Sequence, residues 1–374
     1  MVPRLITNQS GEEFLAMGKQ TSEISKWVHE VLFCLETDKP IILEGIPYYF
    51  YFVAGSTSSD LDAWMKRSIE SGAGVWTLVM GDDSYSYVIE ESSVYWLEND
   101  FSAYDRTQHF LLRKCVDKML KLSGYEELVR FRKAMYGKSL KFDKEKDGKK
   151  SPPVVDIYGV PADMRYTGEA ATCLDNSLIN IVAFAVCHSQ SGFSDQILEQ
   201  NFLKLGLKSK IKRHYFVQHG TFLRGSFLPN IDGGYTWTRL PSFLLKFGKV
   251  LTDPHRILPQ SIPYHHKCAS IMLGQWLSYG DMTNNILYET LDFEIRRITK
   301  GVTPVDVKLD FWQIPMEKST YVTKDVLYDW IMNRYKIELD ELLDALEILR
   351  DVKVTDLPVT WHDQRFDVLL VDYI

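Results

Sequence analysis

The clearest pattern of hydrophobic positions lies in the first third of the chain. Two runs rich in Val, Trp, Tyr, Thr and Ile, residues 75–80 and 85–91, are separated by Gly-Asp-Asp. β-Branched and aromatic residues on both sides of a short turn of this composition predict a β-hairpin. A third run of the same type, residues 94–100, follows a short polar turn and ends at Asp100. We therefore expect three consecutive antiparallel strands.

Apolar residues three or four positions apart mark the expected helices. Helices are predicted over residues 12–34, 60–71, 106–136, 168–187 and 194–205, and over the amphipathic stretch 324–350. Asp60 and Thr323 are suitable N-caps, and Gly206 is suitable for the end of a helix. Two more strand-like runs, residues 214–219 and 221–227, flank Gly220, whereas residues 137–163 are rich in Gly, Pro and Lys and predict a loop.

Length and composition set limits on these elements. A chain of 374 residues is long enough for two or three subdomains. Its five cysteines are widely spaced without a CxxC pair, which favours a reducing compartment and gives no zinc-ribbon signal. The most apolar stretch, residues 178–186, is shorter than the ~20 residues that a membrane-spanning helix needs.

The charge is unevenly distributed. A net charge of −7 argues against nucleic-acid binding. Residues 203–214 nevertheless carry five Lys and Arg and no acid, and residues 138–150 carry six lysines. Both a cationic groove and a solvated basic face agree with these runs.

Three aspartates give the expected hairpin a possible chemistry. If the second and third strands pair around residues 90–93, Asp83 lies opposite Asp100, and a slip of one residue places Asp82 there instead. Opposed side chains are ~4.5–5.5 Å apart at Cβ, and carboxylates this close repel one another without a counter-ion. Oxygen ligands suit Mg²⁺ or Mn²⁺. The alternative is that Gly-Asp-Asp only forms a good turn.

A polar stripe marks the helix expected over 168–187. Thr172, Asn176 and Asn180 are four residues apart and therefore share one helix face. Thr167-Gly168 precedes the stripe, where free N–H groups favour phosphate. We expect Asn180 to be buried by packing and Asn176 to hydrogen-bond with Asp105 and a ribose hydroxyl.

Other conspicuous residues are assigned to packing. The aromatic run 48–52 is expected to be a buried strand or helix segment, and Tyr85 and Tyr87 to pack on one strand face. His265, His266 and Cys268 have no second ligand pair at a zinc-binding spacing.

The polar motifs together resemble a known family. DFSAYDRTQ (100–108) resembles motif A of viral RNA-dependent RNA polymerases, TGEAATCLDNSLIN (167–180) resembles motif B, and LVMGDDSY (78–85) resembles motif C with its GDD sequence. The order C, A, B is similar to that of the permuted polymerases of permutotetraviruses and birnaviruses. Gly-Asp-Asp favours the permutotetravirus-like type, because birnavirus polymerases carry Ala-Asp-Asn there.

The resemblance implies an α+β fold: a right-hand polymerase palm, with an antiparallel sheet flanked by helices, partial fingers and a helical thumb. The implied division is residues 1–72 for partial fingers, 73–213 for the palm and 214–374 for the motif E hairpin and thumb. Within 73–213 the implied segments are motif C at 75–89, motif A at 94–108, a fingers insertion at 121–164, motif B at 165–187 and motif D at 194–213. The N-terminal fingers region of the family is expected to be absent or supplied by another chain.

The implied activity is RNA-templated RNA synthesis, a nucleotidyl transfer by an RNA-directed RNA polymerase in viral genome replication. By resemblance, Asp82, Asp83 and Asp100 are the metal-binding catalytic residues, and Lys210, with Lys208 as its competitor, is the general acid. The residues implied in binding nucleotide or RNA are Arg4, Asp105, Arg165, Thr167, Gly168, Thr172, Asn176 and Arg224.

The implied cofactor is Mg²⁺ or Mn²⁺. The implied partners are template and product RNA, ribonucleoside triphosphates and other replicase proteins, in a replication complex of the host cytoplasm or in a virion. Two alternatives remain: a reverse transcriptase, and a non-catalytic RNA-binding scaffold. A metal-dependent phosphatase would explain neither motif B nor the basic segments.

Overall fold

The computed structural model describes residues 11–35, 39–90, 93–102, 104–135, 172–245, 247–248, 253–307, 313–358 and 363–373. Arg4, Arg165, Thr167, Gly168 and the loop expected over 137–163 lie outside the described residues. Two compact units make up the chain. The first comprises Met1–Val53, Gly74–Ser86 and Glu98–Lys212, and the second comprises Ala54–Ala73, Tyr87–Leu97 and Arg213–Ile374.

A six-stranded sheet of neighbours β1 to β6 in sequence order contains the predicted strands. Its strands are β1 (Ile41–Leu43), β2 (Ile46–Phe52), β3 (Val75–Met80), β4 (Asp83–Glu90), β5 (Ser93–Phe101) and β6 (Ser209–His214). β1 pairs antiparallel with β2, and β2 pairs parallel with β3. Every residue of β3 is buried, which explains its unbroken apolar run. The aromatic run 48–52 was expected to be a buried strand or a helix segment, and it is part of the strand β2.

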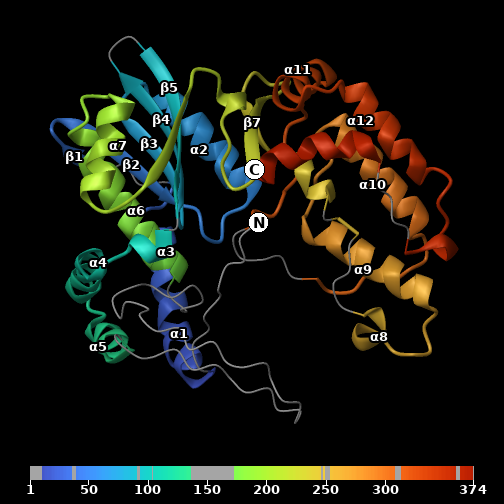
Figure 1. Cartoon of the computed structure of the whole chain (residues 1–374), viewed down its shortest axis with the longest axis horizontal. Helices are drawn as coiled ribbons and strands as arrows, with labels where there is room; N and C mark the ends of the chain where they lie inside the picture. Colours follow the sequence, from blue (N-terminus) through green and yellow to red (C-terminus); the bar gives the residue numbers. More distant parts are fainter. Residues whose placement is uncertain are drawn as a thin grey trace, which may run out of the picture. The chain divides into compact units, whose positions relative to one another are not determined.

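The helices of the first unit include one that is largely buried. They are α1 (Gly11–Trp27), continued by a π-helical turn η1 (Val28–Leu32), α3 (Tyr104–Thr107), α4 (Phe110–Leu122), α5 (Glu126–Met135), α6 (Thr172–Ser189) and α7 (Asp195–Lys204). α6 packs against β2 and β3 and against α4 and α7 (Figure 1). It is therefore apolar on nearly all sides, and its few polar residues face buried partners.

The segment 106–136 is helical as predicted, but it is divided into α3, α4 and α5. His109 is the N-cap of α4, and its Nδ1 accepts a hydrogen bond from the Leu111 N–H. Gly124, with φ of +88°, separates α4 from α5. Apolar periodicity continues through both breaks, which is why the sequence pattern concealed them.

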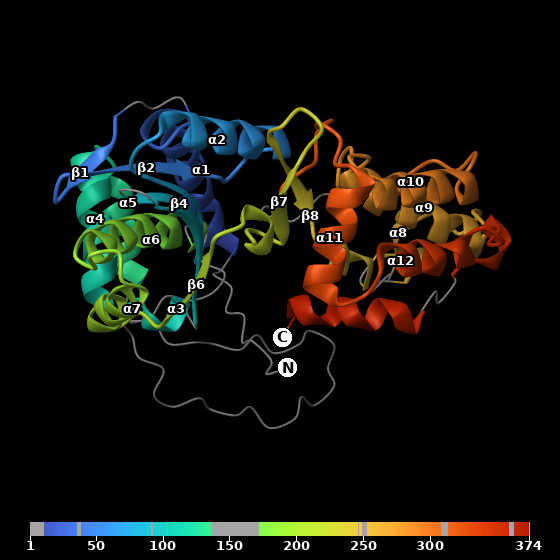
Figure 2. The ribbon, with the colours of Figure 1, turned by 90° about the horizontal axis from the view of Figure 1, so that it is seen from above.

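The second unit contains a hairpin and a group of helices. Its elements are α2 (Ser58–Ser71), η2 (Val217–His219), β7 (Gly225–Pro229), β8 (Tyr235–Arg239), η3 (Pro241–Leu245), α8 (Pro254–Ile257), α9 (Tyr264–Ser278), α10 (Ile286–Ile298), α11 (Lys324–Tyr335), α12 (Leu339–Leu346), η4 (Glu347–Leu349), η5 (Val354–Asp356) and η6 (Gln364–Tyr373). α10 packs against both α9 and α12 (Figure 2). Trp64, Trp237, Trp276 and Trp330 are fully buried and form much of the core.

Two predicted boundaries in the second unit need correction. α2 begins after Thr57, and Asp60 occupies the third helical position, where its Oδ2 accepts from the Thr57 N–H at 2.8 Å. Thr323 caps α11 as predicted, but Lys336, at φ of +58°, ends that helix before α12 begins.

The strand predicted over 214–219 is also wrong. β6 ends at His214, and the 3₁₀ turn η2 follows. A hairpin lies further along the chain, where β7 and β8 pair from Gly225↔Arg239 to Pro229↔Tyr235. Among the described residues, no helix is long and apolar enough to span a membrane.

Candidate active site

The turn between β3 and β4 is held by α6. The Gly81 N–H donates to Ser177 Oγ at 2.7 Å, and Asn180 Nδ2 donates to the carbonyls of Gly81 and Asp82, at 3.2 Å each. Gly81 has φ of +65°, a conformation in which a side chain would be strained. Because α6 hydrogen-bonds to the backbone of this turn, it also fixes the backbone position of Asp82.

The pairing of β4 with β5 follows from two side-chain contacts. Asn99 Nδ2 donates to Ser84 Oγ at 3.4 Å, and the rings of Tyr87 and Trp96 are 5.4 Å apart. A slip of one residue would place the members of each pair on opposite faces of the sheet. Continued by one position, the observed register puts Asp83 opposite Asp100, the first of the two predicted arrangements.

Lys210 forms an ion pair with Asp100. Its Nζ lies 3.7 Å from Asp100 Oδ2, and Lys212 Nζ lies 3.3 Å from Glu98 Oε1 two positions along each strand. The carbonyl of Lys208 accepts from the Ser102 N–H at 2.8 Å, which places Lys208 beyond Asp100. Of the two lysines considered from the sequence, Lys210 is therefore the one beside Asp100. The pair is solvent-exposed and contributes little to stability, about 0–1 kcal/mol.

Asn176 forms the hydrogen bond that the sequence predicted. Its Nδ2 donates to Asp105 Oδ1 at 3.0 Å, while Gln108 Nε2 donates to Asn176 Oδ1 at 2.6 Å. Tyr104 OH donates to the Asn176 carbonyl at 3.1 Å. Since Gln108 occupies the amide oxygen, the amide nitrogen is directed toward Asp105.

Asn180, as expected, is fully buried, and it hydrogen-bonds to the Gly81–Asp82 turn. Thr172 is the first residue of α6 and is half-buried. Arg224 belongs to the second unit, where it lies in a tight turn at φ of +60°.

Sequence reasoning missed Ser177 and Gln108. Ser177 lies next to the recognised polar stripe, and its hydroxyl also donates to the Cys173 carbonyl at 2.8 Å. Gln108 is the last residue of the motif A-like segment and is fully buried. A polar side chain at a buried position is the signal that finds such residues, and it requires the tertiary structure.

The neighbouring thiol does not add a nucleophile. Burial raises the pKa of Cys173 to about 12, and the nearby negative charge of Asp82 also raises it. Cys173 Sγ lies 3.7 Å from Met80 Sδ. A thiol with this pKa remains protonated at neutral pH and is a poor nucleophile.

The carboxylates are part-exposed and offer only oxygen ligands, which fits Mg²⁺ or Mn²⁺. In the described part of the chain, no group of three or more His, Cys, Asp or Glu side chains is arranged to hold a metal ion. Mg²⁺ commonly takes one or two carboxylates and completes its coordination with water and substrate phosphates. Asp82, Asp83 and Asp100 are all described, and they do not form such a group of three.

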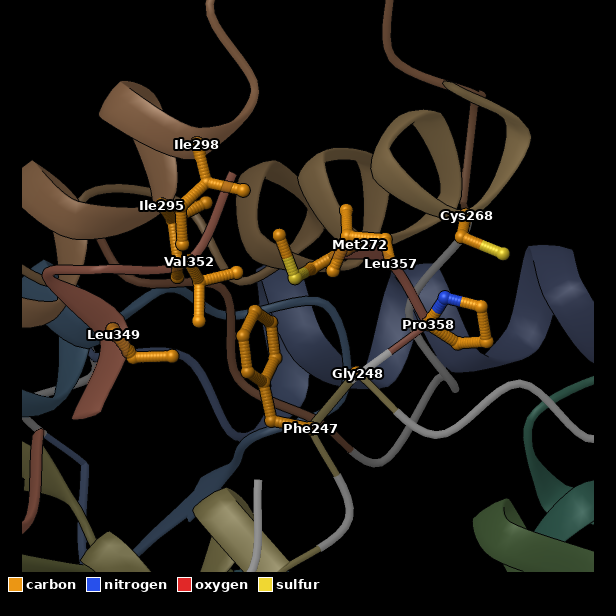
Figure 3. Close-up of a pocket in the computed structure, with 10 residues that line it drawn as sticks. All are labelled: Phe247, Gly248, Cys268, Met272, Ile295, Ile298, Leu349, Val352, Leu357 and Pro358. Atoms are coloured by element: carbon orange, nitrogen blue, oxygen red, sulfur yellow. The ribbon is translucent and has the colours of Figure 1, made fainter. Parts of the chain in front are cut away.

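A pocket in the second unit has a different chemistry. Figure 3 shows Phe247, Met272, Ile295 and Leu349 directed toward its interior. Cys268 is its one titratable lining residue, and burial raises the pKa of that thiol. The pocket contains none of the predicted site residues.

Comparisons with known proteins add little. No protein-family model matches the sequence, and no curated protein matches it. The X-ray structure of the birnavirus VP1-VP3 complex is similar at 10% identity with a TM-score of 0.38, covering 86% of this chain and 54% of that chain. This chain thus spans about half the length of that one. A likeness at this level does not establish a common fold, so the function is argued from the site itself.

Proposed function

We propose that this chain catalyses RNA-templated transfer of a nucleotide to a 3′-hydroxyl, as an RNA-directed RNA polymerase of viral replication. One observation carries the proposal: α6 hydrogen-bonds to both other polar segments. Asn180 holds the Gly81–Asp82 turn, and Asn176 holds Asp105. The three segments that resemble polymerase motifs thus meet around one helix within the first unit.

Asp82, Asp83 and Asp100 are the residues that would hold Mg²⁺ or Mn²⁺. When bound, the metal supplies activation of the attacking hydroxyl and neutralisation of phosphate charge. The register of β4 and β5 supports this assignment because it opposes Asp83 and Asp100. The hydrogen bonds from α6 to the turn would keep Asp82 in position, which favours catalysis by reducing reorganisation.

Lys210 is proposed to protonate the pyrophosphate leaving group. Its ammonium lies beside Asp100, where a lysine can also neutralise the phosphates of an incoming nucleotide. The long, exposed side chain can move from Asp100 to the substrate at small cost, because the ion pair is weak.

Asp105 and Asn176 are proposed to recognise the ribose 2′-hydroxyl. Their mutual hydrogen bond orients both groups, and Asp105 is part-exposed. Tyr104, which precedes Asp105 in the sequence, is buried and stacks on Phe101 with ring centroids 4.7 Å apart. A ring packed in this way does not block a 2′-hydroxyl, which favours ribonucleotides over the deoxynucleotides of a reverse transcriptase.

The test is primer extension on a short RNA template with Mg²⁺ or Mn²⁺. We expect extension by the parent chain and none by Asp82→Ala or Asp100→Asn. Glu98→Gln is a matched control: Glu98 lies two residues before Asp100 on β5 and also pairs with a lysine. It should retain extension.

Equal extension by all variants would contradict the metal assignment. No extension by the parent, with RNA binding retained, would favour the non-catalytic scaffold.

The ribose assignment has its own test. Asp105→Ala should lower discrimination against deoxynucleotides, measured as the ratio of kcat/KM for the two nucleotides. Unchanged discrimination would show that Asp105 does not recognise the 2′-hydroxyl.

A further inference from the structure

Two consecutive aromatic side chains of the second unit are largely in solvent. Tyr215 is 65% exposed and Phe216 is 61% exposed. They join the end of β6 to η2, and Phe216 has extended backbone angles, φ −122° and ψ 126°. The two rings therefore offer flat aromatic surfaces to solvent.

A third ring and one lysine lie near these two rings. His219 lies beside Phe216, with ring centroids 5.5 Å apart. Burial lowers the pKa of His219, and the positive charges of His214 and Lys336 lower it further. Lys336 is therefore a cation near the His219 ring.

Lys336 is well placed to contact a ligand. It is the exposed C-cap residue of α11, the helix that packs against η2, and its Nζ donates to the Asn333 carbonyl at 2.8 Å. A helix C-terminus attracts cations, so this lysine fits its own helix as well.

We infer that Tyr215, Phe216 and His219 form a stacking surface for the unpaired bases of single-stranded RNA, with Lys336 contacting the phosphate backbone. Exposed rings beside a cation are a combination that binds single strands without reading their sequence. The positive charge of Lys336 suits the phosphate backbone of such a strand. This inference rests on the proposed function for the choice of RNA over DNA.

The test is binding of a fluorescein-labelled 12-nucleotide oligouridylate to the full chain, followed by fluorescence anisotropy. The double variant Tyr215→Ala/Phe216→Ala should bind about tenfold or more weakly, because stacking is lost at both rings. Lys336→Ala should weaken binding less and reduce its salt dependence by about one phosphate contact.

Phe293→Ala is the matched control. Phe293 on α10 is 66% exposed, but Arg296 and Arg297 near it pair with Asp292 and Glu294. This variant should bind RNA like the parent. An abasic oligomer of the same length separates stacking from charge, and the double variant should bind it as the parent does.

Unchanged oligouridylate binding by the double variant overturns the inference. So does equal weakening toward the oligouridylate and the abasic oligomer, because that result leaves no role for the bases. Photocrosslinking of a 5-iodouridine oligomer to the unmutated chain avoids any folding defect. A crosslink within 213–219 supports the surface, and crosslinks confined to other segments contradict it. Asp100→Asn should bind and crosslink normally, so a failure of synthesis and a failure of this surface are distinguishable.

Discussion

Two tight turns of this chain both use the left-handed backbone conformation, but with different residues. Between β3 and β4, Gly81 takes the left-handed conformation, and α6 binds the turn from outside. Between Phe222 and Gly225, the left-handed positions hold Leu223 and Arg224, at φ of +49° and +60°. Such positions favour Gly, Asn or Asp, so the second turn carries strain that the first avoids.

The second turn persists because its hairpin holds it. Phe222 and Gly225 exchange two backbone hydrogen bonds, and the Leu240 N–H donates to the Arg224 carbonyl at 2.8 Å. Trp237 on β8 lies directly over Gly225, with no room for a side chain between them. The comparison teaches that a turn can be determined by its own residues or imposed by the strands around it.

The largest expected effect is on the turn at Leu223 and Arg224, which the surrounding strands hold in place. A Cβ at Gly225 would lie 2.2 Å from the Trp237 ring, so Gly225→Ala should lower the free energy of unfolding by about 3 kcal/mol or more. Urea unfolding measures it. Gly234→Ala, in the same hairpin, is the control, because its Cβ would meet the Asn230 side chain at an ordinary 3.6 Å. Similar losses for both variants would show that the Trp237 contact is not what fixes the turn.

A smaller effect is expected where α6 holds the first turn. Asn180→Leu keeps the side-chain size but removes both hydrogen bonds to the Gly81–Asp82 turn. Primer extension should fall by roughly 100-fold, because Asp82 is no longer held in position. Activity equal to that of the parent would mean that the turn positions itself without α6.

The hairpin of the second turn should respond to pH through Asp62. Asp62 Oδ1 accepts from the Trp237 N–H at 2.6 Å, and burial raises the pKa of this carboxyl to about 7. Because this pKa is raised, the stability that Asp62 contributes is fully present below the unfolded-state pKa of about 4. That contribution is lost as the pH rises through 7.

Asp62→Asn removes the titration. At pH 8 we expect the free energy of unfolding of this variant to be about 1–2 kcal/mol higher than that of the parent. At pH 4.5 this difference should shrink or reverse. Urea unfolding at both pH values measures this, and a constant difference between variant and parent would contradict it.

The smallest effects compare the two turns directly. Gly81→Ala should destabilise by about 1 kcal/mol, since a Cβ there is strained even though it meets no atom within 4 Å. Leu223→Asn should instead stabilise by about 0.5 kcal/mol, because Asn tolerates the left-handed region. Thermal unfolding measures the stability of both variants. Destabilisation by Leu223→Asn would mean that the packing of Leu223 outweighs the strain of its backbone.

Much of the first unit was predictable because its signals are local. Strands were expected at 75–80, 85–91 and 94–100, and the structure has them within two residues of these limits. A short turn leaves few possible registers, so the facing of Asp83 and Asp100 could be reduced to two alternatives. The bond between Asn176 and Asp105 followed from helical spacing and from the need of a buried amide for a partner.

The failures have a common cause. His109 capping α4, Gly124 ending it and the strained turn at Leu223 all interrupt segments whose apolar pattern continues. Hydrophobic periodicity reports which residues are buried, and it does not report where the backbone changes direction. The choice of Thr57 over Asp60 as the cap of α2 is of the same kind.

By itself the sequence determined the hairpin, its Gly-Asp-Asp turn and the polar stripe, because alternation and helical spacing act between near neighbours. Only the tertiary structure decided what each stripe residue binds. Asn180 reaches a turn 99 residues away, and Gln108 orients an amide 68 residues away. Burial at a distance makes these partners necessary, and no local pattern records which residue will supply them.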